Sequence, residues 1–166
     1  MTYLVVSFLA AFLLAAYVTW TAARLDRLHD RCAAARASLD AQLVRRAAAA
    51  SALARDHAGV LGERADLLRA AAHAALDAGD DGRELAETDL TRELRHLPWS
   101  AVEPVLADVG AASGRVTLSR HIYNDAVRDT LALRRRRFPR ALRLSAGRPW
   151  PRYFDIDDTP PGRSGR

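Results

Sequence analysis

With 166 residues, the chain is long enough for one domain with a core and an appended segment but too short for two ordinary domains. Its positive charge comes only from arginine, which together with abundant alanine is typical of GC-rich bacterial coding, and a pI of about 10.3 does not by itself indicate a nucleic-acid partner. A single cysteine excludes an internal disulfide, and the absence of a cysteine and histidine array argues against structural zinc.

Residues 2–23 are the first predicted element, a membrane-spanning helix. They carry no charge, and as a helix they span about 33 Å, enough for a hydrocarbon core of about 30 Å. Tyr3, Tyr17 and Trp20 lie near the ends, where interfacial aromatic residues are expected. No basic segment precedes this long, uncharged apolar run. We therefore expect residues 1–23 to form a membrane anchor, and a cleaved signal peptide or a buried core helix is the alternative.

Arginine placement predicts the orientation of this anchor. No arginine precedes the span, whereas Arg24, Arg27 and Arg31 follow it directly. The positive-inside bias therefore predicts a single-pass protein of the cell inner membrane or plasma membrane, with its N-terminus outside and the remainder in the cytoplasm. A cell-envelope protein with an extracytoplasmic helical domain is the alternative.

Residues 24–148 are predicted to form a helical domain whose first helix continues out of the membrane. Its apolar positions recur at intervals of three and four, as an amphipathic helix requires. Gly59 and Gly62 predict a bend, after which the pattern resumes from Leu67 to Leu76. The apolar positions of the first helix are Leu25, Leu28, Cys32, Ala35, Leu39, Leu43, Ala50, Leu53 and Leu61.

A turn and a second helix follow over residues 78–97. Gly79 can close the preceding helix, and Asp81 with Glu84 has the spacing of a capping box. Asp80 and Asp81 are too few ligands for a calcium loop, so we expect no metal there. The next helix, 83–97, stops before Pro98 and is predicted to bury Leu85, Leu90, Leu94 and Leu97.

The last predicted helix starts at a second capping box, Ser100 with Glu103, breaks around Gly110 to Gly114, and ends before Pro139. One face carries Leu118, Ile122, Ala126 and Leu133, and the adjacent row carries Tyr123, Val127 and Leu131. The tail, residues 149–166, is predicted to be extended to about residue 158 and disordered beyond it.

Two stretches resemble the LemA family of bacterial membrane proteins. In YNDAVRD followed by FP, the matching residues are Tyr123, Asn124, Val127, Arg128, Phe138 and Pro139, with Tyr153 and Phe154 at the place of the family's tail aromatic residue. In ASLDAQLVRR, residues 37–46, they are Leu39, Asp40, Gln42, Leu43, Arg45 and Arg46. The chain departs from the family at 47–53, where AAAASAL replaces an Asp-Leu-Ile-Pro-Asn-Leu-type motif, and near Thr130, where a second Asn is missing.

This resemblance implies an all-α protein: a single N-terminal transmembrane helix followed by an antiparallel, up-and-down, four-helix-type bundle. It implies no catalytic residues. From spacing, we expect Tyr123 to pack on the first helix with its hydroxyl bonded to Asp40, Gln42 or Arg46, and Arg128 to pair with Asn124 and Asp125. The candidate interaction residues are Asp40, Gln42, Arg45, Arg46, Tyr123, Asn124, Asp125 and Arg128.

Four consecutive arginines near the end of the last helix predict a second membrane contact. If the bundle contains an even number of antiparallel helices, the end of the last helix lies close to the bilayer again. Basic residues there attract anionic lipid head groups. A solvated helix end, with the tail aromatic residues packed on the bundle, is the alternative. The membrane-proximal arginines are Arg24, Arg27, Arg31, Arg134, Arg135, Arg136 and Arg137.

The sequence thus predicts a membrane-anchored helical scaffold that presents an interaction surface. Its expected partners are the lipid bilayer, anionic head groups and either an unknown protein or further copies of itself, with no nucleic acid. No phosphate-binding loop or nucleophile elbow occurs. We therefore expect no reaction, cofactor or metal, and an enzyme of unrecognised class is the remaining alternative.

Overall fold

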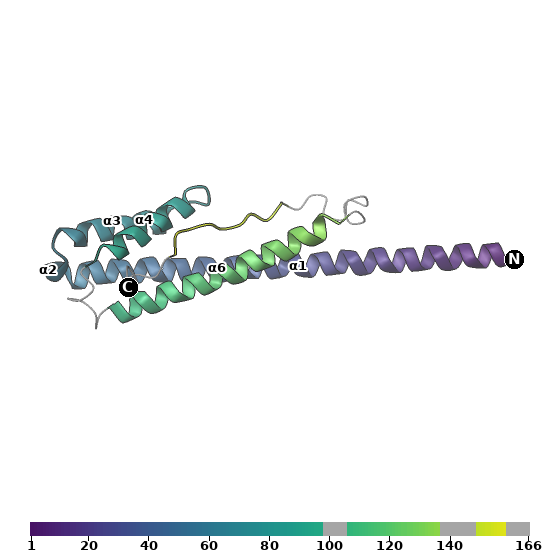
Figure 1. Ribbon diagram of the computed structural model, residues 1–166, viewed down its shortest axis with the longest axis horizontal. Helices are drawn as coiled ribbons and strands as arrows, with labels where there is room; N and C mark the ends of the chain where they lie inside the picture. The colour runs from purple at the N-terminus through teal and green to yellow at the C-terminus, as the bar shows by residue number, and fades with distance from the viewer. Residues whose placement is uncertain (98–105, 137–148, 159–166) are drawn as a thin grey trace, which may run out of the picture.

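The computed structural model describes residues 1–97, 106–136 and 149–158, and within these ranges the chain contains helices and no strand. Figure 1 shows one long rod, α1, with two short helices beside its C-terminal part and another helix along its middle. The prediction of an all-α protein is confirmed. The helices are α1 (Thr2–Asp56), α2 (Ala58–Leu61), α3 (Glu63–Asp77), α4 (Arg83–Arg95) and α6 (Leu106–Arg134).

Helix α1 runs without interruption for 55 residues. Its sequence is dominated by alanine, leucine and arginine, which are strong helix formers, and contains neither glycine nor proline. Among the described helices, only α1 is long and apolar enough to cross a membrane, and 6% of its most apolar window is buried. That exposure disfavours a soluble core helix, and the predicted continuity of one helix from residues 2–23 into the residues that follow is confirmed.

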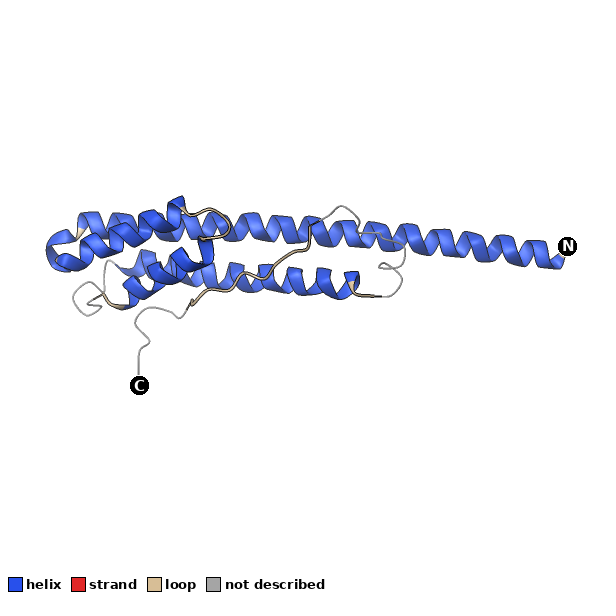
Figure 2. Cartoon of the chain, turned by 90° about the horizontal axis from the view of Figure 1, so that it is seen from above, coloured by secondary structure: helices blue, strands red, loops and turns tan. Residues whose placement is uncertain are grey.

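The predicted bend at Gly59 and Gly62 is also confirmed. Helix α1 ends at Asp56, the single turn of α2 follows, and Gly62 adopts φ 56, a left-handed conformation that glycine reaches without steric cost. The chain reverses at this bend, so that α3 lies along the C-terminal part of α1 in both views (Figures 1 and 2).

Two details predicted for the next turn and helix are wrong. Helix α4 begins after Gly82 without a side-chain cap, so Asp81 and Glu84 do not form a capping box. Leu85 is 68% exposed. The buried stripe of α4 instead follows the spacing i, i+3, i+4, i+7 from Glu87, and Leu85 lies on the opposite side of the helix from it. The stripe consists of Glu87, Leu90, Thr91 and Leu94.

Helix α6 is continuous through Gly110 and Gly114, where the sequence predicted a break. A Cβ atom added at either glycine would meet nothing within 4 Å, so no neighbouring element forces the helix to turn there. The row containing Tyr123 is buried, whereas Leu118 and Ile122 in the adjacent row are 60% and 49% exposed. The predicted start at Ser100 and the stop at Pro139 lie outside the described residues.

The buried side chains form two clusters along α1. The distal cluster lies near the α2 bend and consists of Ala47, Ala50, Leu53, Ala54, Leu61, Ala65, Leu68, Ala72, Ala75, Leu90, Leu94, Leu97 and Val109. The proximal cluster lies nearer the apolar end and consists of Cys32, Leu39, Leu43, Val116, Tyr123, Ala126, Val127, Leu131, Phe154 and Ile156.

Helix α1 contributes to both clusters mainly through one row of residues, which we call the inner seam, with Ala47 and Ala54 of the distal cluster beside it. Its positions alternate in steps of four and three, a heptad spacing that keeps one side of a helix toward its neighbours. Two of the nine positions are arginines, Arg36 and Arg46, placed where apolar residues are expected. The inner seam is Leu25, His29, Cys32, Arg36, Leu39, Leu43, Arg46, Ala50 and Leu53.

Candidate functional site

An extended segment, residues 149–158, packs on the helices, and we call it the strap. It contains neither helix nor strand and lies alongside α1 and α6 in both views (Figures 1 and 2). Phe154 and Ile156 are 2% and 6% exposed and belong to the proximal cluster. The structure shows the extended conformation that the sequence predicts for this part of the tail. The aromatic ring of Phe154 lies in the proximal cluster.

Two neighbouring residues of α6 hold the strap backbone. Asn124 donates from Nδ2 to the carbonyl oxygen of Phe154 at 3.0 Å and accepts the Phe154 N–H on Oδ1 at 3.0 Å. The Tyr123 hydroxyl donates to the carbonyl oxygen of Arg152 at 2.7 Å. The prediction that this hydroxyl bonds to Asp40, Gln42 or Arg46 is therefore wrong. Burial raises the pKa of Tyr123, which favours the neutral phenol that makes this bond.

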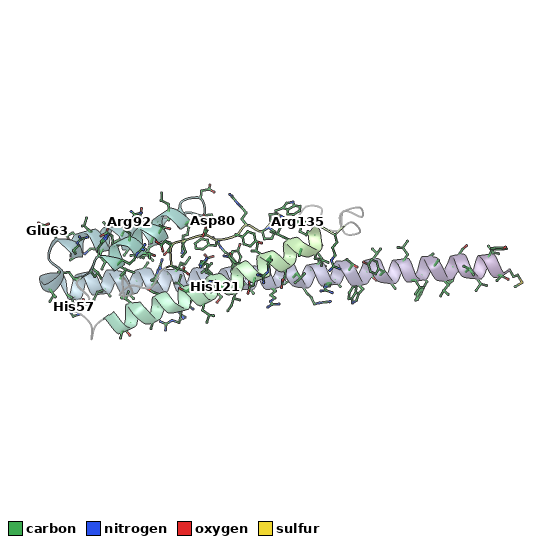
Figure 3. The ribbon with its side chains drawn as sticks, in the orientation of Figure 1. His57, Glu63, Asp80, Arg92, His121 and Arg135 are labelled. Carbon is green, nitrogen blue, oxygen red and sulfur yellow. The ribbon has the colours of Figure 1, made fainter. Side chains whose placement is uncertain are left out.

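Arg36 connects α1 to the strap and to the α3–α4 turn. Its guanidinium carbon lies 5.1 Å from the ring centroid of Phe154 and 5.7 Å from that of Tyr123, both within cation–π range. The same side chain pairs with Asp40 at 3.4 Å and with Asp80 at 3.2 Å. Figure 3 labels Asp80 at the turn facing the strap.

Polar contacts fix both ends of the strap. Arg134 donates to the Pro149 carbonyl oxygen at 2.8 Å, and its guanidinium lies 4.4 Å from the Trp150 ring centroid. At the other end, Arg120 pairs with Asp158 at 2.9 Å, Arg95 pairs with Asp157, and Glu84 accepts the N–H of Asp155 at 3.0 Å. Helices α1, α4 and α6 therefore all contribute to holding this segment.

A cleft of about 450 Å³ opens between the strap, the α3–α4 turn and Arg36. Trp150 and Tyr153 line it and remain 58% and 51% exposed. Its carboxylates come from Asp80, Asp81 and Glu84, two of which already pair with Arg36 or with the strap. In the described part of the chain, no group of three or more histidine, cysteine, aspartate or glutamate side chains is placed to hold a metal ion.

A second polar group lies in the helical core, where Arg46 and Glu87 form a buried ion pair. Nη2 of Arg46 lies 2.5 Å from Oε2 of Glu87, and the side chains are 2% and 0% exposed. Arg46 Nη1 also donates to the Thr91 hydroxyl at 3.1 Å, and Arg83 Nε lies 3.7 Å from the second Glu87 oxygen. Burial raises the pKa of Glu87, against the opposing effect of the nearby Arg46 charge.

The eight candidate interaction residues do not form one site. Arg46 reaches α4 and Asp40 pairs with Arg36, while Tyr123 and Asn124 bind the strap. The expected pairing of Arg128 with Asp125 is confirmed at 3.0 Å, on the exposed surface of α6. Half-buried Gln42 has a buried Oε1 without a hydrogen bond within the described residues, and Arg45 is exposed. The functional residues that the sequence reasoning missed include Arg36, Glu84, Glu87 and Arg120.

The end of α6 lies beside the first turns of α1 that follow the apolar run. The Thr130 hydroxyl donates to the Leu28 carbonyl oxygen at 3.4 Å, and Arg134 Nη1 lies 3.4 Å from His29 Nε2. Arg134 itself is 6% exposed and faces the strap. The exposed arginines at this end are Arg24, Arg27, Arg31, Arg135 and Arg136, whereas Arg137 lies outside the described residues.

Comparisons of the chain with models of known protein families, with curated proteins and with solved structures found no match in any of the three.

Proposed function

We propose that this protein is a membrane-anchored, non-enzymatic helical scaffold of the LemA type. In this proposal the anchor crosses the inner or plasma membrane once, and an antiparallel four-helix-type bundle lies at the cytoplasmic face. The observation that carries it is the dual use of α1. Its first 22 residues carry no charge and are exposed except for buried Thr21 and half-buried Val18 and Ala22, and the same unbroken helix supplies the inner seam of both clusters.

Continuity of α1 supports a stalk without a flexible joint. The inner seam begins at Leu25, which is 1% exposed, two residues beyond the uncharged run that ends at Ala23. Two residues of helix correspond to about 3 Å. The helical domain therefore begins at the membrane surface, and its orientation follows the orientation of the span.

The basic end of the domain supports contact with anionic lipids. In this region five exposed arginines from α1 and α6 outnumber three exposed carboxylates, Asp26, Asp30 and Asp129. Each arginine near an anionic leaflet contributes on the order of 1 kcal/mol. Arg24 also lies 5.6 Å from the ring centroid of Trp20, an arrangement suited to the interface between head groups and hydrocarbon.

The use of the polar side chains supports a scaffold rather than an enzyme. The strap is held by Tyr123, Asn124, Arg120 and Arg134. Glu87 forms the buried ion pair with Arg46. Buried Cys32 has a raised pKa because of desolvation, which disfavours the reactive thiolate.

Topology tests this proposal. In a Cys32→Ser background, Ala111→Cys places one exposed thiol on α6. We expect a membrane-impermeant maleimide to label it only after cell lysis, with the protein retained in the membrane pellet after an alkaline carbonate wash. Labelling in intact cells would reverse the orientation and favour the envelope alternative, and release from the pellet would exclude the anchor.

The lipid contact has a separate test. A fragment of residues 24–166 is expected to float with phosphatidylglycerol vesicles at low salt and to dissociate when salt screens the charges. Replacing Arg135 and Arg136 by glutamate should weaken flotation, whereas Asp125→Ala, on another part of α6, should not. Equal binding by all three forms would contradict a head-group site at the end of α6.

A further inference from the structure

Buried polar atoms gather between α1 and α4, on four side chains that we call the polar layer. The polar layer consists of Gln42 and Arg46 on α1 and of Arg83 and Glu87 on α4. Within the described residues, four of its buried atoms have no hydrogen-bond partner, namely Gln42 Oε1, Arg46 Nε, Arg83 Nε and Glu87 Oε1. The side chains of Arg46 and Glu87 are 2% and 0% exposed. Native proteins satisfy most such atoms with protein groups or ordered water, so the polar layer requires a further partner.

The Glu87 carboxylate brings two of the donors together. Arg46 uses one edge of its planar guanidinium for the Thr91 hydroxyl and the Glu87 carbonyl oxygen. The remaining Nη2 hydrogen, which bonds to Glu87 Oε2, therefore lies on the edge that Nη2 shares with Nε. Arg83 Nε lies 3.7 Å from Glu87 Oε1, beyond the roughly 2.7–3.2 Å of a direct hydrogen bond. Both Nε–H groups thus lie beside one carboxylate.

Gln42 lies at the level of this carboxylate. It precedes Arg46 by four residues, which places it on the same side of α1, one turn earlier. Residue numbers increase together along α1 and α4, since Arg36 pairs with Asp80 and Arg46 pairs with Glu87. One turn before Arg46 therefore corresponds to the first turn of α4, and the buried amide oxygen of Gln42 faces the same polar group.

The four atoms require a partner that both donates and accepts. The two Nε–H groups are donors, and the amide and carboxylate oxygens are acceptors. The charges that act on Glu87 come from Arg46, Arg83 and Asp40, so two positive groups meet two negative ones. An anion has no hydrogen to donate to a carboxylate, and a cation would be repelled by the arginines. A water molecule is neutral, and in buried sites it makes two to four hydrogen bonds of both kinds.

We propose that the polar layer binds one buried water molecule, which donates to Gln42 Oε1 and Glu87 Oε1 and accepts from the Nε–H groups of Arg46 and Arg83. This water links α1 to α4 where the inner seam has an arginine in place of an apolar residue. It lets a single carboxylate serve two arginines, one directly and one through the water. The inference goes beyond the proposed function and does not depend on the membrane anchor.

Replacing Gln42 by methionine tests the proposal by the sign of its effect. Methionine has a similar size and lacks the amide. If Oε1 accepts from a bound water, Gln42→Met breaks that bond, and the unfolding equilibrium constant of the full-length chain in detergent and urea should rise about 2- to 10-fold. If Oε1 has no partner, the same change removes a buried unsatisfied group, and the constant should stay equal or fall. That second result would overturn the proposal.

Arg45→Met is the matched control for this experiment. Arg45 is exposed and directly follows the position before it in the same turn of α1 as Arg46. Its replacement should change the unfolding equilibrium constant by about twofold or less, as is usual for a surface position. A rise for Arg45→Met equal to that for Gln42→Met would assign the effect to helix propensity and would also overturn the proposal.

A crystal structure of the full-length chain, grown with bromide in the buffer, tests the occupant directly. We expect density within hydrogen-bonding distance of the four atoms and no anomalous bromide signal there. A bromide signal would identify an anion site and contradict the water. A Gln42 amide that donates directly to Glu87, or no density beside the four atoms, would also contradict it. Each of these results leaves the anchor proposal unaffected, because the polar layer lies in the helical domain.

Discussion

Different elements cover the inner seam of α1 in the distal and proximal clusters. In the distal cluster, α3 and α4 cover α1 with alanine and leucine, and each helix satisfies its own backbone hydrogen bonds. The proximal cluster lacks those two helices, and Phe154 of the strap fills the space. An extended backbone has unpaired N–H and C=O groups that require partners. That requirement explains why Asn124, Tyr123 and Arg134 are gathered there.

The two arginines of the inner seam repeat this contrast. Arg46, beside the distal cluster, is closed off by one carboxylate and one hydroxyl from α4. Arg36, beside the proximal cluster, retains 28% side-chain exposure and lies over two aromatic rings. A fully buried guanidinium depends strongly on its partner, whereas a partly hydrated one does not. The most sensitive single position should therefore be in the distal cluster.

The largest expected effect is that of Glu87→Ala, which leaves Arg46 buried and unpaired. Removing one member of a buried pair costs about 3–5 kcal/mol of unfolding free energy. Urea unfolding of the full-length protein in detergent, followed by circular dichroism, measures it. The double variant Arg46→Met with Glu87→Leu should recover most of the loss. A cost of Glu87→Ala below about 1 kcal/mol would contradict the buried pair.

The next effect is that of Phe154→Ala, which should release the strap while leaving the distal cluster intact. Truncating a buried phenylalanine costs about 3–5 kcal/mol when the loss is global, but a peripheral segment can detach without global unfolding. We therefore expect faster hydrogen exchange at the backbone N–H groups of Phe154 and Asp155. Exchange in α3 should be unchanged. Tyr153→Ala, at a half-exposed neighbouring residue, is the matched control and should change neither.

Asn124→Ala should loosen the strap less than Phe154→Ala does. It removes two hydrogen bonds to one residue, at a cost of about 1–3 kcal/mol, part of which water recovers if the strap lifts. Asp125→Ala on the same helix breaks only an exposed pair and should change stability by less than about 0.5 kcal/mol. Equal exchange rates at Phe154 in these two variants would contradict a specific role of the Asn124 amide.

How far the sequence predicts this fold depends on the distance over which each signal acts. Local signals predict α1, the bend at Gly62 and the buried row of α6, because helix propensity, glycine geometry and three-to-four spacing act within a few residues. The role of Leu85 was misjudged for the same reason. Its neighbours allow two stripes on α4, and only the long-range partner of Glu87 decides between them.

The strap site is predicted less completely. The resemblance to LemA indicates Tyr123, Asn124 and an aromatic residue in the tail, yet the sequence does not show that they contact one another. Arg36 and Arg46 carry a usable signal, since each interrupts an apolar heptad row at a position that points into the core. Their partners, Phe154 and Glu87, lie far away in sequence, and no local pattern identifies them.

The smallest effect is that of Tyr123→Phe, and it carries a pH signature. At pH 8 the loss of the hydroxyl bond to Arg152 should cost about 0.5–1.5 kcal/mol. Because burial raises the pKa of Tyr123, the folded state keeps its proton above the unfolded value of about 10 while the unfolded chain releases it. The stability of the parent chain then falls with pH by up to about 1.4 kcal/mol per unit from this group.

The Tyr123→Phe variant lacks this pH dependence. The difference in unfolding free energy between the parent chain and the variant should therefore shrink as the pH rises from 8 to 11. Urea unfolding at several pH values measures it. Both chains should carry Cys32→Ser, because the Cys32 thiol lies in the same cluster and its pKa is also raised by burial. Arg36 opposes the shift by favouring the phenolate, which limits its size. A difference that stays constant across this range would mean that the Tyr123 hydroxyl is hydrated, and that the strap is held by Asn124 and Phe154 without it.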